Sequence, residues 1–165
     1  MRTTHLQLRP FTREDTTSYA NILRKPEVVE FLPNEQDTNQ ADKTAETMIT
    51  FWLTGQKEDG YAPWAVIHQE TGTLIGHVGF RKSEEFRSPE LLYMFDSNFW
   101  GRGYATEAVR AACNIAQKQL SLPYVMAVAL RSNIGSIAVM KKCGFKFEAN
   151  LQDGGFQLVR YGLTF

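Results

Sequence analysis

The sequence predicts a mixed α/β fold, in the α+β class, with a central sheet and helices packed on its faces. Short runs rich in apolar, β-branched and aromatic residues recur along the chain, and longer segments repeat apolar residues at helical spacing. Their order is one strand, two helices, three strands, and then alternating helix and strand. A chain of 165 residues suits one domain, so we expect a single domain over residues 1–165.

The first third of the chain is expected to hold one strand and two or three helical segments. Residues 3–11 alternate polar and apolar side chains, which predicts a strand, and residues 12–15 resemble an acidic helix N-terminus. Pro26 interrupts that helix or starts a short second one. Residues 37–53 predict a longer helix. The intervening loop, residues 31–37, either lines a substrate site or is a plain surface connection.

The middle of the chain predicts three strands. Residues 62–69 and 74–81 form a hairpin whose turn contains Gly72, a residue suited to positive φ. Residues 82–89 are expected to be a charged turn. Residues 91–95, Leu-Leu-Tyr-Met-Phe, have the apolar and aromatic composition of a buried strand.

The last third predicts alternation of helix and strand. Apolar residues recur at helical spacing over residues 106–120, and an apolar strand follows at 125–130. A second helix begins at Asn133. Two final strands, at 145–151 and 156–165, are separated by a two-glycine turn.

Composition excludes several classes of partner. Lysine plus arginine and aspartate plus glutamate both number 18, so no net field recruits nucleic acid or an anionic membrane. The N-terminus lacks the apolar core of a signal peptide, and no apolar run is long enough to span a bilayer. We therefore expect a cytoplasmic protein that binds neither nucleic acid nor membrane. The oligomeric state is left open, a homodimer included.

The cysteines and histidines give no sign of a metal site or a disulfide. Cys113 and Cys143 lack metal-ligand spacing, and His5, His68 and His77 are scattered. Small buried thiols are the expected role of both cysteines, the alternative being a nucleophile.

A glycine-rich turn carries the first functional signal. In residues 99–108, Phe-Trp-Gly-Arg-Gly-Tyr-Ala-Thr-Glu-Ala, two glycines separate the end of a strand from the start of a helix. The first N–H groups of a helix have no partner within the helix, and they lie at the positive end of its dipole. A pyrophosphate is therefore a natural ligand for this turn. The alternative is an ordinary connection between strand and helix.

A second segment repeats the arrangement. After the apolar run at 125–130, Asn133 is a candidate N-cap, and Gly144 lies where a left-handed C-cap is expected. Together the two segments resemble the acyl-CoA-binding motifs of the GNAT superfamily of N-acetyltransferases. Their residue patterns are most similar to those of its RimJ/RimL-type branch. The resemblance is strong over residues 88–147. It implies a twisted, mostly antiparallel sheet of about six or seven strands, flanked by helices, with the fourth and fifth strands splayed apart.

The resemblance also implies acetyl-CoA as cosubstrate, with no metal. The cofactor-binding residues it implies are Phe95, Trp100, Gly101, Arg102, Gly103, Tyr104, Ala105, Thr106 and Asn133. The pyrophosphate would rest on main-chain N–H groups from 101 to 106, and the pantetheine would pair like a strand with the backbone around Phe95. Arg102 either adds charge near a phosphate or projects into solvent. Tyr104 is expected to pack rather than react, and Asn133 would hydrogen-bond the pantetheine as well as cap its helix.

The catalytic residues depart from the wider family. Many members protonate the departing thiolate with a tyrosine, which here aligns with Met140, a side chain that cannot donate a proton. In the RimJ/RimL-type branch a serine at the position of Ser136 is thought to serve. Ser136 lies one helical turn after Asn133 on the same face. The alternative is a structural hydroxyl bonded to the preceding turn.

The general base is less clearly marked. The resemblance implies an acidic residue near the start of the strand that enters the site, which makes Glu90 the candidate for accepting the amine proton through a water. Asp96, Glu84 and Glu85 are competitors, and each is otherwise a solvated charge.

The expected function is an N-acetyltransferase that moves an acetyl group from acetyl-CoA to a primary amine by direct attack in a ternary complex. The acceptor is a protein N-terminus, such as that of a ribosomal protein, or a small amine. The alternative is a module that binds or senses acyl-CoA without catalysis.

Overall fold

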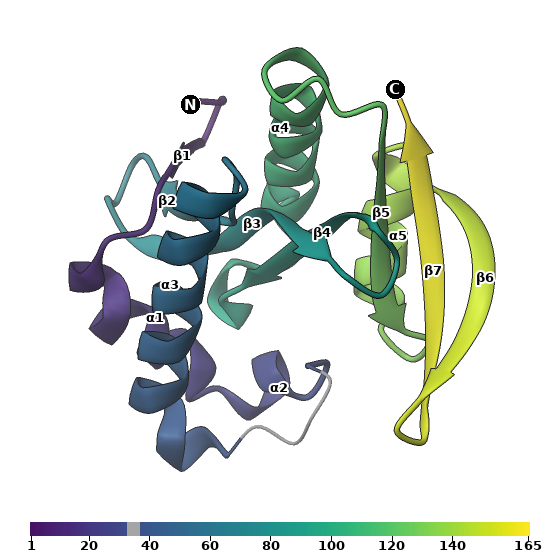
Figure 1. Cartoon of the computed structure of the whole chain (residues 1–165). Coiled ribbons are helices and arrows are strands. Elements are labelled where there is room, and N and C mark those ends of the chain that lie inside the picture. The colour runs from purple at the N-terminus through teal and green to yellow at the C-terminus, as the bar shows by residue number, and fades with distance from the viewer. Residues whose placement is uncertain (33–36) are drawn as a thin grey trace.

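A seven-stranded sheet forms the frame of the protein in the computed structural model, which describes residues 1–32 and 37–165 (Figure 1). The strand order is β1-β2-β3-β4-β5-β7-β6. All neighbouring strands are antiparallel except β4 and β5. The strands are β1 (Leu6–Arg9), β2 (Trp64–His68), β3 (Leu74–Ser83), β4 (Ser88–Phe95), β5 (Tyr124–Leu130), β6 (Lys146–Asp153) and β7 (Phe156–Thr164). The predicted fold class, strand number and mostly antiparallel pairing are confirmed.

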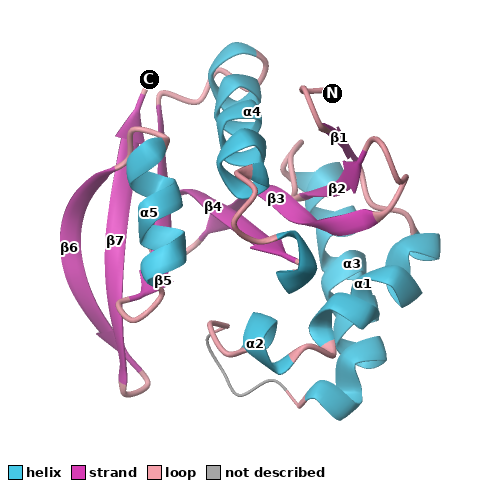
Figure 2. Ribbon diagram, turned by 180° about the vertical axis from the view of Figure 1, so that it is seen from behind, coloured by secondary structure: helices cyan, strands magenta, loops and turns pink. Residues whose placement is uncertain are grey.

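Helices cover the two faces of the sheet. Figure 2 shows α4 and α5 on one face, and Figure 1 shows α1 and α3 on the other. The helical elements are η1 (Arg13–Asp15), α1 (Thr16–Leu23), α2 (Pro26–Val29), η2 (Thr38–Gln40), α3 (Ala41–Glu58), η3 (Ser97–Phe99), α4 (Tyr104–Lys118) and α5 (Ile134–Lys142). A different pair of helices therefore packs on each face of the sheet.

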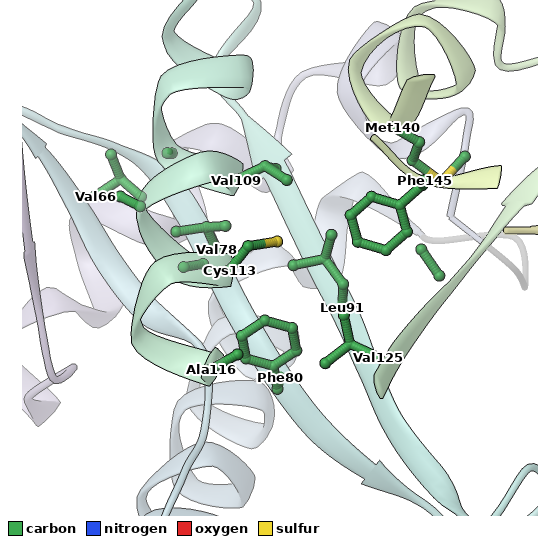
Figure 3. Packing of buried hydrophobic residues seen from close by; sticks show 14 of the residues in the cluster. Val66, Val78, Phe80, Leu91, Val109, Cys113, Ala116, Val125, Met140 and Phe145 are labelled. Atoms are coloured by element: carbon green, nitrogen blue, oxygen red, sulfur yellow. The ribbon is translucent and has the colours of Figure 1, made fainter. Parts of the chain in front are cut away.

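Each layer has its own apolar cluster. Under α4 and α5, Phe80, Val109 and Met140 belong to one cluster, in which all three are completely buried (Figure 3). Under α1 and α3, Ile49 and Tyr19 belong to a second cluster. Apolar burial at roughly 25 cal/mol per Å² is the main stabilising term for both layers.

A polar pair is enclosed in the second cluster. The hydroxyl of Tyr19 and Nδ1 of His77 are 2.8 Å apart, and both side chains are buried. Burial lowers the pKa of His77 to about 3, so the ring is neutral near pH 7. His77 is thus a satisfied core residue.

Two glycines have the positive φ that the sequence predicted. Gly72 has φ +67° in the β2–β3 turn, and Gly144 has φ +90° just after α5. The expected charged turn at 82–89 is shorter, because β3 and β4 stay paired through Ser83 and Ser88. The expected loop at 31–37 lies mostly outside the described residues.

Candidate active site

The fourth and fifth strands diverge, as the resemblance implied. Glu90 and Met126 are the one register pair between β4 and β5 in the described parts of the chain. Beyond it β4 stays paired with β3 as far as Phe95, and β5 stays paired with β7 as far as Leu130. Two strand edges thus face each other inside the sheet with backbone groups that can pair with an extended ligand.

The turn after β4 is held open by two glycines. Gly101 has φ +74° and Gly103 has φ +84°, and a Cβ added at either position would meet nothing within 4 Å. Just before them, the carboxylate of Asp96 accepts from the backbone N–H of Asn98 at 2.8 Å and caps η3. The glycines therefore present bare backbone to open space at the end of β4.

The start of α4 supplies backbone N–H groups that could bind an anion. Gly103 is the N-cap of α4 and, having no side chain, leaves the N–H groups of Tyr104, Ala105 and Thr106 without a side-chain acceptor from the cap. Beside them lies an open pocket of about 690 Å³. Three basic residues contribute to its lining, Arg2, Arg110 and Lys142, together with Glu107, whose carboxylate is held by Thr3 and His5. Backbone donors and basic side chains together suit the phosphates of a CoA molecule.

The aromatic and basic residues of this turn take defined positions. The indole Nε1 of Trp100 donates to the carbonyl of Phe95 at 2.8 Å, while nearly half of the Trp100 surface stays exposed. The guanidinium of Arg102 lies 5.7 Å from the centre of the Phe99 ring. Tyr104 packs against the apolar cluster under α4, and its hydroxyl lies 3.1 Å from Nε2 of the buried His68.

The N-terminus of α5 is formed as the sequence predicted. The side chain of Asn133 accepts from the backbone N–H of Ser136 at 2.9 Å, which confirms Asn133 as the N-cap. This bond orients the first turn of α5 and places Ser136 beside β4. Met140, one turn further on, is fully buried, and its thioether has no proton to give.

The structure adds Tyr93, which the sequence reasoning had left out. The phenol oxygen of Tyr93 on β4 lies 2.7 Å from Oγ of Ser136 and 2.9 Å from the Ser136 carbonyl. The sequence could have indicated Tyr93, because a tyrosine within an apolar strand needs a hydrogen-bond partner for its hydroxyl. The partner was not predictable, since it lies 43 residues away in the sequence.

The candidate base lies on the opposite face of β4. Side chains alternate along a strand, so Glu90 points away from the face that carries Leu91 and Tyr93. Its side chain is 7% exposed, and its Oε2 accepts from Nε of Arg81 at 2.7 Å. Glu90 is thus a buried carboxylate at the point where β4 and β5 begin to diverge.

The competing carboxylates have other positions. Asp96 forms an ion pair with Lys25 as well as capping η3. Glu84 lies in the β3–β4 turn, 86% exposed and 3.4 Å from Lys82. Glu85 is also exposed in that turn. The structure therefore brings only Glu90 of these four to the divergence as a buried acid.

Two polar contacts tie α2 to the glycine-rich turn, and the sequence had not indicated either. Lys25 pairs with Asp96, and the hydroxyl of Ser97 donates to the Glu27 carboxylate at 2.6 Å. Both contacts reach η3, directly before the glycines. The short helix α2 therefore supports the wall of the candidate site.

Glu107 joins the N-terminal segment to α4. Its Oε1 accepts from the hydroxyl of Thr3 at 2.6 Å and from the backbone N–H of His5 at 2.8 Å. Its Oε2 lies 2.9 Å from Nδ1 of His5. Burial of the carboxylate raises the pKa of Glu107, but the hydrogen bonds from Thr3 and His5 outweigh burial and hold that pKa below its ordinary value.

We expect Glu107→Ala to lower the free energy of unfolding by about 1–2 kcal/mol at pH 7, because the hydrogen bonds from Thr3 and His5 to the carboxylate are lost. Because the pKa of Glu107 is lower in the folded state, its carboxylate stabilises the folded protein at pH values above its unfolded-state pKa of about 4.3. That stabilisation is lost as the pH falls through the folded-state pKa. Urea unfolding at pH 7 and below pH ~4 measures this, with exposed Glu46→Ala on α3 as control. An equal difference from wild type at both pH values would contradict it.

Comparison with known proteins identifies the family. The chain matches the acetyltransferase (GNAT) domain over residues 5–146. It belongs to the GNAT acetyltransferase family. A relative named as the uncharacterized N-acetyltransferase YnaD of Bacillus subtilis (strain 168) is 27% identical over 146 residues, which are 88% of this chain and 82% of that protein.

Solved structures agree. An acetyltransferase of Agrobacterium tumefaciens str. C58 is 26% identical, with a TM-score of 0.82 and coverage of 98% of this chain and 92% of that one. The RimL ribosomal L7/L12 alpha-N-protein acetyltransferase, solved in complex with coenzyme A, has a TM-score of 0.78 over 98% of this chain and 95% of that one. At 15% identity the latter shows a shared fold.

The described residues contain neither a membrane-spanning helix nor a candidate metal cluster. No helix in residues 1–32 and 37–165 is long and apolar enough to cross a membrane. The same residues hold no group of three or more histidine, cysteine or acidic side chains that could bind a metal ion.

Proposed function

We propose that this GNAT acetyltransferase transfers the acetyl group of acetyl-CoA to a primary amine by direct attack in a ternary complex. The single observation that carries the proposal is the divergence of β4 from β5 beside a glycine-rich helix N-terminus. The open strand edges suit a pantetheine arm, and the bare N–H groups suit its pyrophosphate. Both features belong to one continuous stretch of chain, from Glu90 to Thr106.

The residues have separate roles in this proposal. Acetyl-CoA supplies an activated acyl group as a thioester. The backbone from Gly101 to Thr106 binds the pyrophosphate, with Arg102 adding positive charge and Trp100 fixing the end of β4. The backbone around Phe95 and the side chain of Asn133 hold the pantetheine arm. Binding of this kind places the carbonyl against the amine, and positioning alone lowers the barrier substantially.

Two proton transfers accompany the reaction. A nitrogen–carbon bond forms and the carbon–sulfur bond breaks, while the amine loses a proton and the departing sulfur gains one. Ser136 donates to the sulfur on the α5 side of β4, and solvent returns a proton to Oγ of Ser136. Glu90 receives the amine proton through a water on the opposite side. Glu90 then passes that proton to solvent, so that the carboxylate is ready for the next turnover.

The acceptor in this proposal is a protein N-terminus, such as that of a ribosomal protein, or a small amine. The RimJ/RimL-type sequence motif at residues 99–108 supports this choice. The test is thiol release from acetyl-CoA with N-terminal peptides, polyamines, aminoglycosides and amino acids. Amine-dependent release supports the proposal. Tight acetyl-CoA binding without release for any amine would favour a non-catalytic binding module instead.

We expect no acetyl-enzyme, because neither thiol is activated. Burial raises the pKa of Cys113 to about 12 and also raises that of Cys143, so both stay protonated near pH 7. The double variant Cys113→Ala with Cys143→Ala should keep its kcat and show sequential kinetics. Intact mass spectrometry during turnover provides the check. An acetyl adduct in stoichiometric amount on either cysteine would rule out direct attack.

A further inference from the structure

Tyr93 joins the two walls of the diverging strands. It lies on β4, whereas Ser136 lies on α5, which packs beside β5. The phenol oxygen is within hydrogen-bond distance of two oxygen atoms of one residue, Oγ and the carbonyl of Ser136. A side chain of one wall thus contacts the proposed proton donor of the other.

The direction of these hydrogen bonds follows from chemistry. A carbonyl oxygen can only accept, so the contact at 2.9 Å requires Tyr93 to donate its single proton to the Ser136 carbonyl. The contact at 2.7 Å then requires Ser136 to donate its hydroxyl proton to Tyr93. In this arrangement the Ser136 proton is directed toward Tyr93 and is not free for a ligand.

A second arrangement needs no movement of heavy atoms. If the Tyr93 proton turns from the carbonyl to Oγ, the Ser136 hydroxyl becomes an acceptor from Tyr93 and directs its own proton elsewhere. Both hydroxyl hydrogens can rotate about their C–O bonds, so the two arrangements can interconvert without moving the rest of either side chain. The Tyr93 hydroxyl can therefore support Ser136 both at rest and while Ser136 donates.

We propose that Tyr93 is a positioning residue that sets the direction of the Ser136 proton, releasing it toward the sulfur of CoA when Tyr93 donates to Oγ. The inference rests on the proposed function. In this chain, a phenol on β4 thus supports the serine, where Met140 on α5 offers no donor.

Tyr93 acts by keeping its own proton. Burial raises its pKa above the ordinary value of a tyrosine, so the phenol keeps its proton near pH 7. A donated hydrogen bond also stabilises negative charge that develops on Oγ as Ser136 gives up its proton. Removing only the hydroxyl separates this role from the packing of the ring.

The test is a double-mutant cycle of Tyr93→Phe and Ser136→Ala, with kcat and the Kd of acetyl-CoA measured for each variant. Tyr93→Phe should lower kcat about tenfold, as expected for one lost hydrogen bond to a charged group. Its Kd should stay within a few-fold of wild type. In the Ser136→Ala background the same change should have almost no further effect on kcat. In the Ser136→Thr background, which retains the hydroxyl, it should again lower kcat.

A second readout does not depend on turnover. The pKa of the thiol of bound CoA, followed by thiolate absorbance, should rise in Tyr93→Phe and rise further in Ser136→Ala. The matched control is Tyr124→Phe, which removes a hydroxyl that donates to Glu148 at 2.9 Å at the far end of β5. That control should leave the thiol pKa and kcat unchanged.

The outcomes distinguish this inference from the function on which it rests. If wild type binds no CoA and acetylates no amine of the panel, the proposed function fails, and the inference fails with it. If wild type is active and Tyr93→Phe matches it in kcat and in thiol pKa, only the role of Tyr93 is overturned. Equal losses from Tyr93→Phe with and without the Ser136 hydroxyl would also overturn it, because they would show that Tyr93 does not act through Ser136.

Discussion

Ser136→Ala should lower kcat by about 10²- to 10⁴-fold where proton transfer limits the rate, the usual effect of removing one positioned proton donor. The Kd of acetyl-CoA should change by no more than a few-fold. The backbone N–H of Ser136 is bonded to Asn133, and this bond does not involve the hydroxyl. The start of α5 should therefore survive the substitution.

Parallel measurement of kcat and Kd separates the chemical step from binding. Ser18→Ala, at an exposed position on α1, is the matched control and should behave as wild type. Pre-steady-state kinetics should first show that chemistry, not product release, limits turnover of the chosen amine. If Ser136→Ala then turns over like wild type, Ser136 is a structural hydroxyl and the sulfur takes its proton from water.

Gly103→Val should weaken acetyl-CoA binding at least 30-fold, or about 2 kcal/mol. At φ +84° a β-branched residue is strained, and relief of that strain rotates the N–H groups at the start of α4. A valine Cβ meets no protein atom within 4 Å, so its side chain occupies the space where the pyrophosphate would bind. The folded protein should therefore tolerate the change better than the ligand does.

Calorimetric titration with acetyl-CoA measures the effect. Gly72→Val is a matched control, because Gly72 also has positive φ and open surroundings but lies in the β2–β3 turn. Both variants should lose similar amounts of stability, and only Gly103→Val should lose affinity. Unchanged affinity in a folded Gly103→Val protein would show that the ligand does not contact this turn.

Local signals predicted most of the fold. Periodicity located each long helix and most strands, since an amphipathic helix and a half-buried strand repeat at different spacings. Turn and cap chemistry located Gly72, Asn133 and Gly144, whose roles depend on neighbours within a few residues. The sequence predicted too long a turn between β3 and β4, because the charged residues at its ends continue the strand pairing beyond the apolar core.

Contacts between distant segments were not predictable in the same way. The glycine-rich turn could be recognised because its donors come from consecutive backbone groups. Tyr93 and Ser136, or Lys25 and Asp96, meet only once the sheet and its helices have assembled. Nothing within a few residues of Tyr93 indicates its partner, so these side-chain pairs required the structure.

The divergence of β4 and β5 also decides where the sheet carries unpaired strand edges. Unpaired strand edges usually lie at the margins of a sheet, where another chain can add to them. Here two such edges lie in the interior of the strand order, between β3 and β7 and beneath α4 and α5. The outer margins are protected differently: β1 has only four residues and is followed by Pro10, and β6 carries Lys146, Glu148 and Asp153. The unpaired edges of β4 and β5 thus lie in a place that the strands of other molecules do not easily reach.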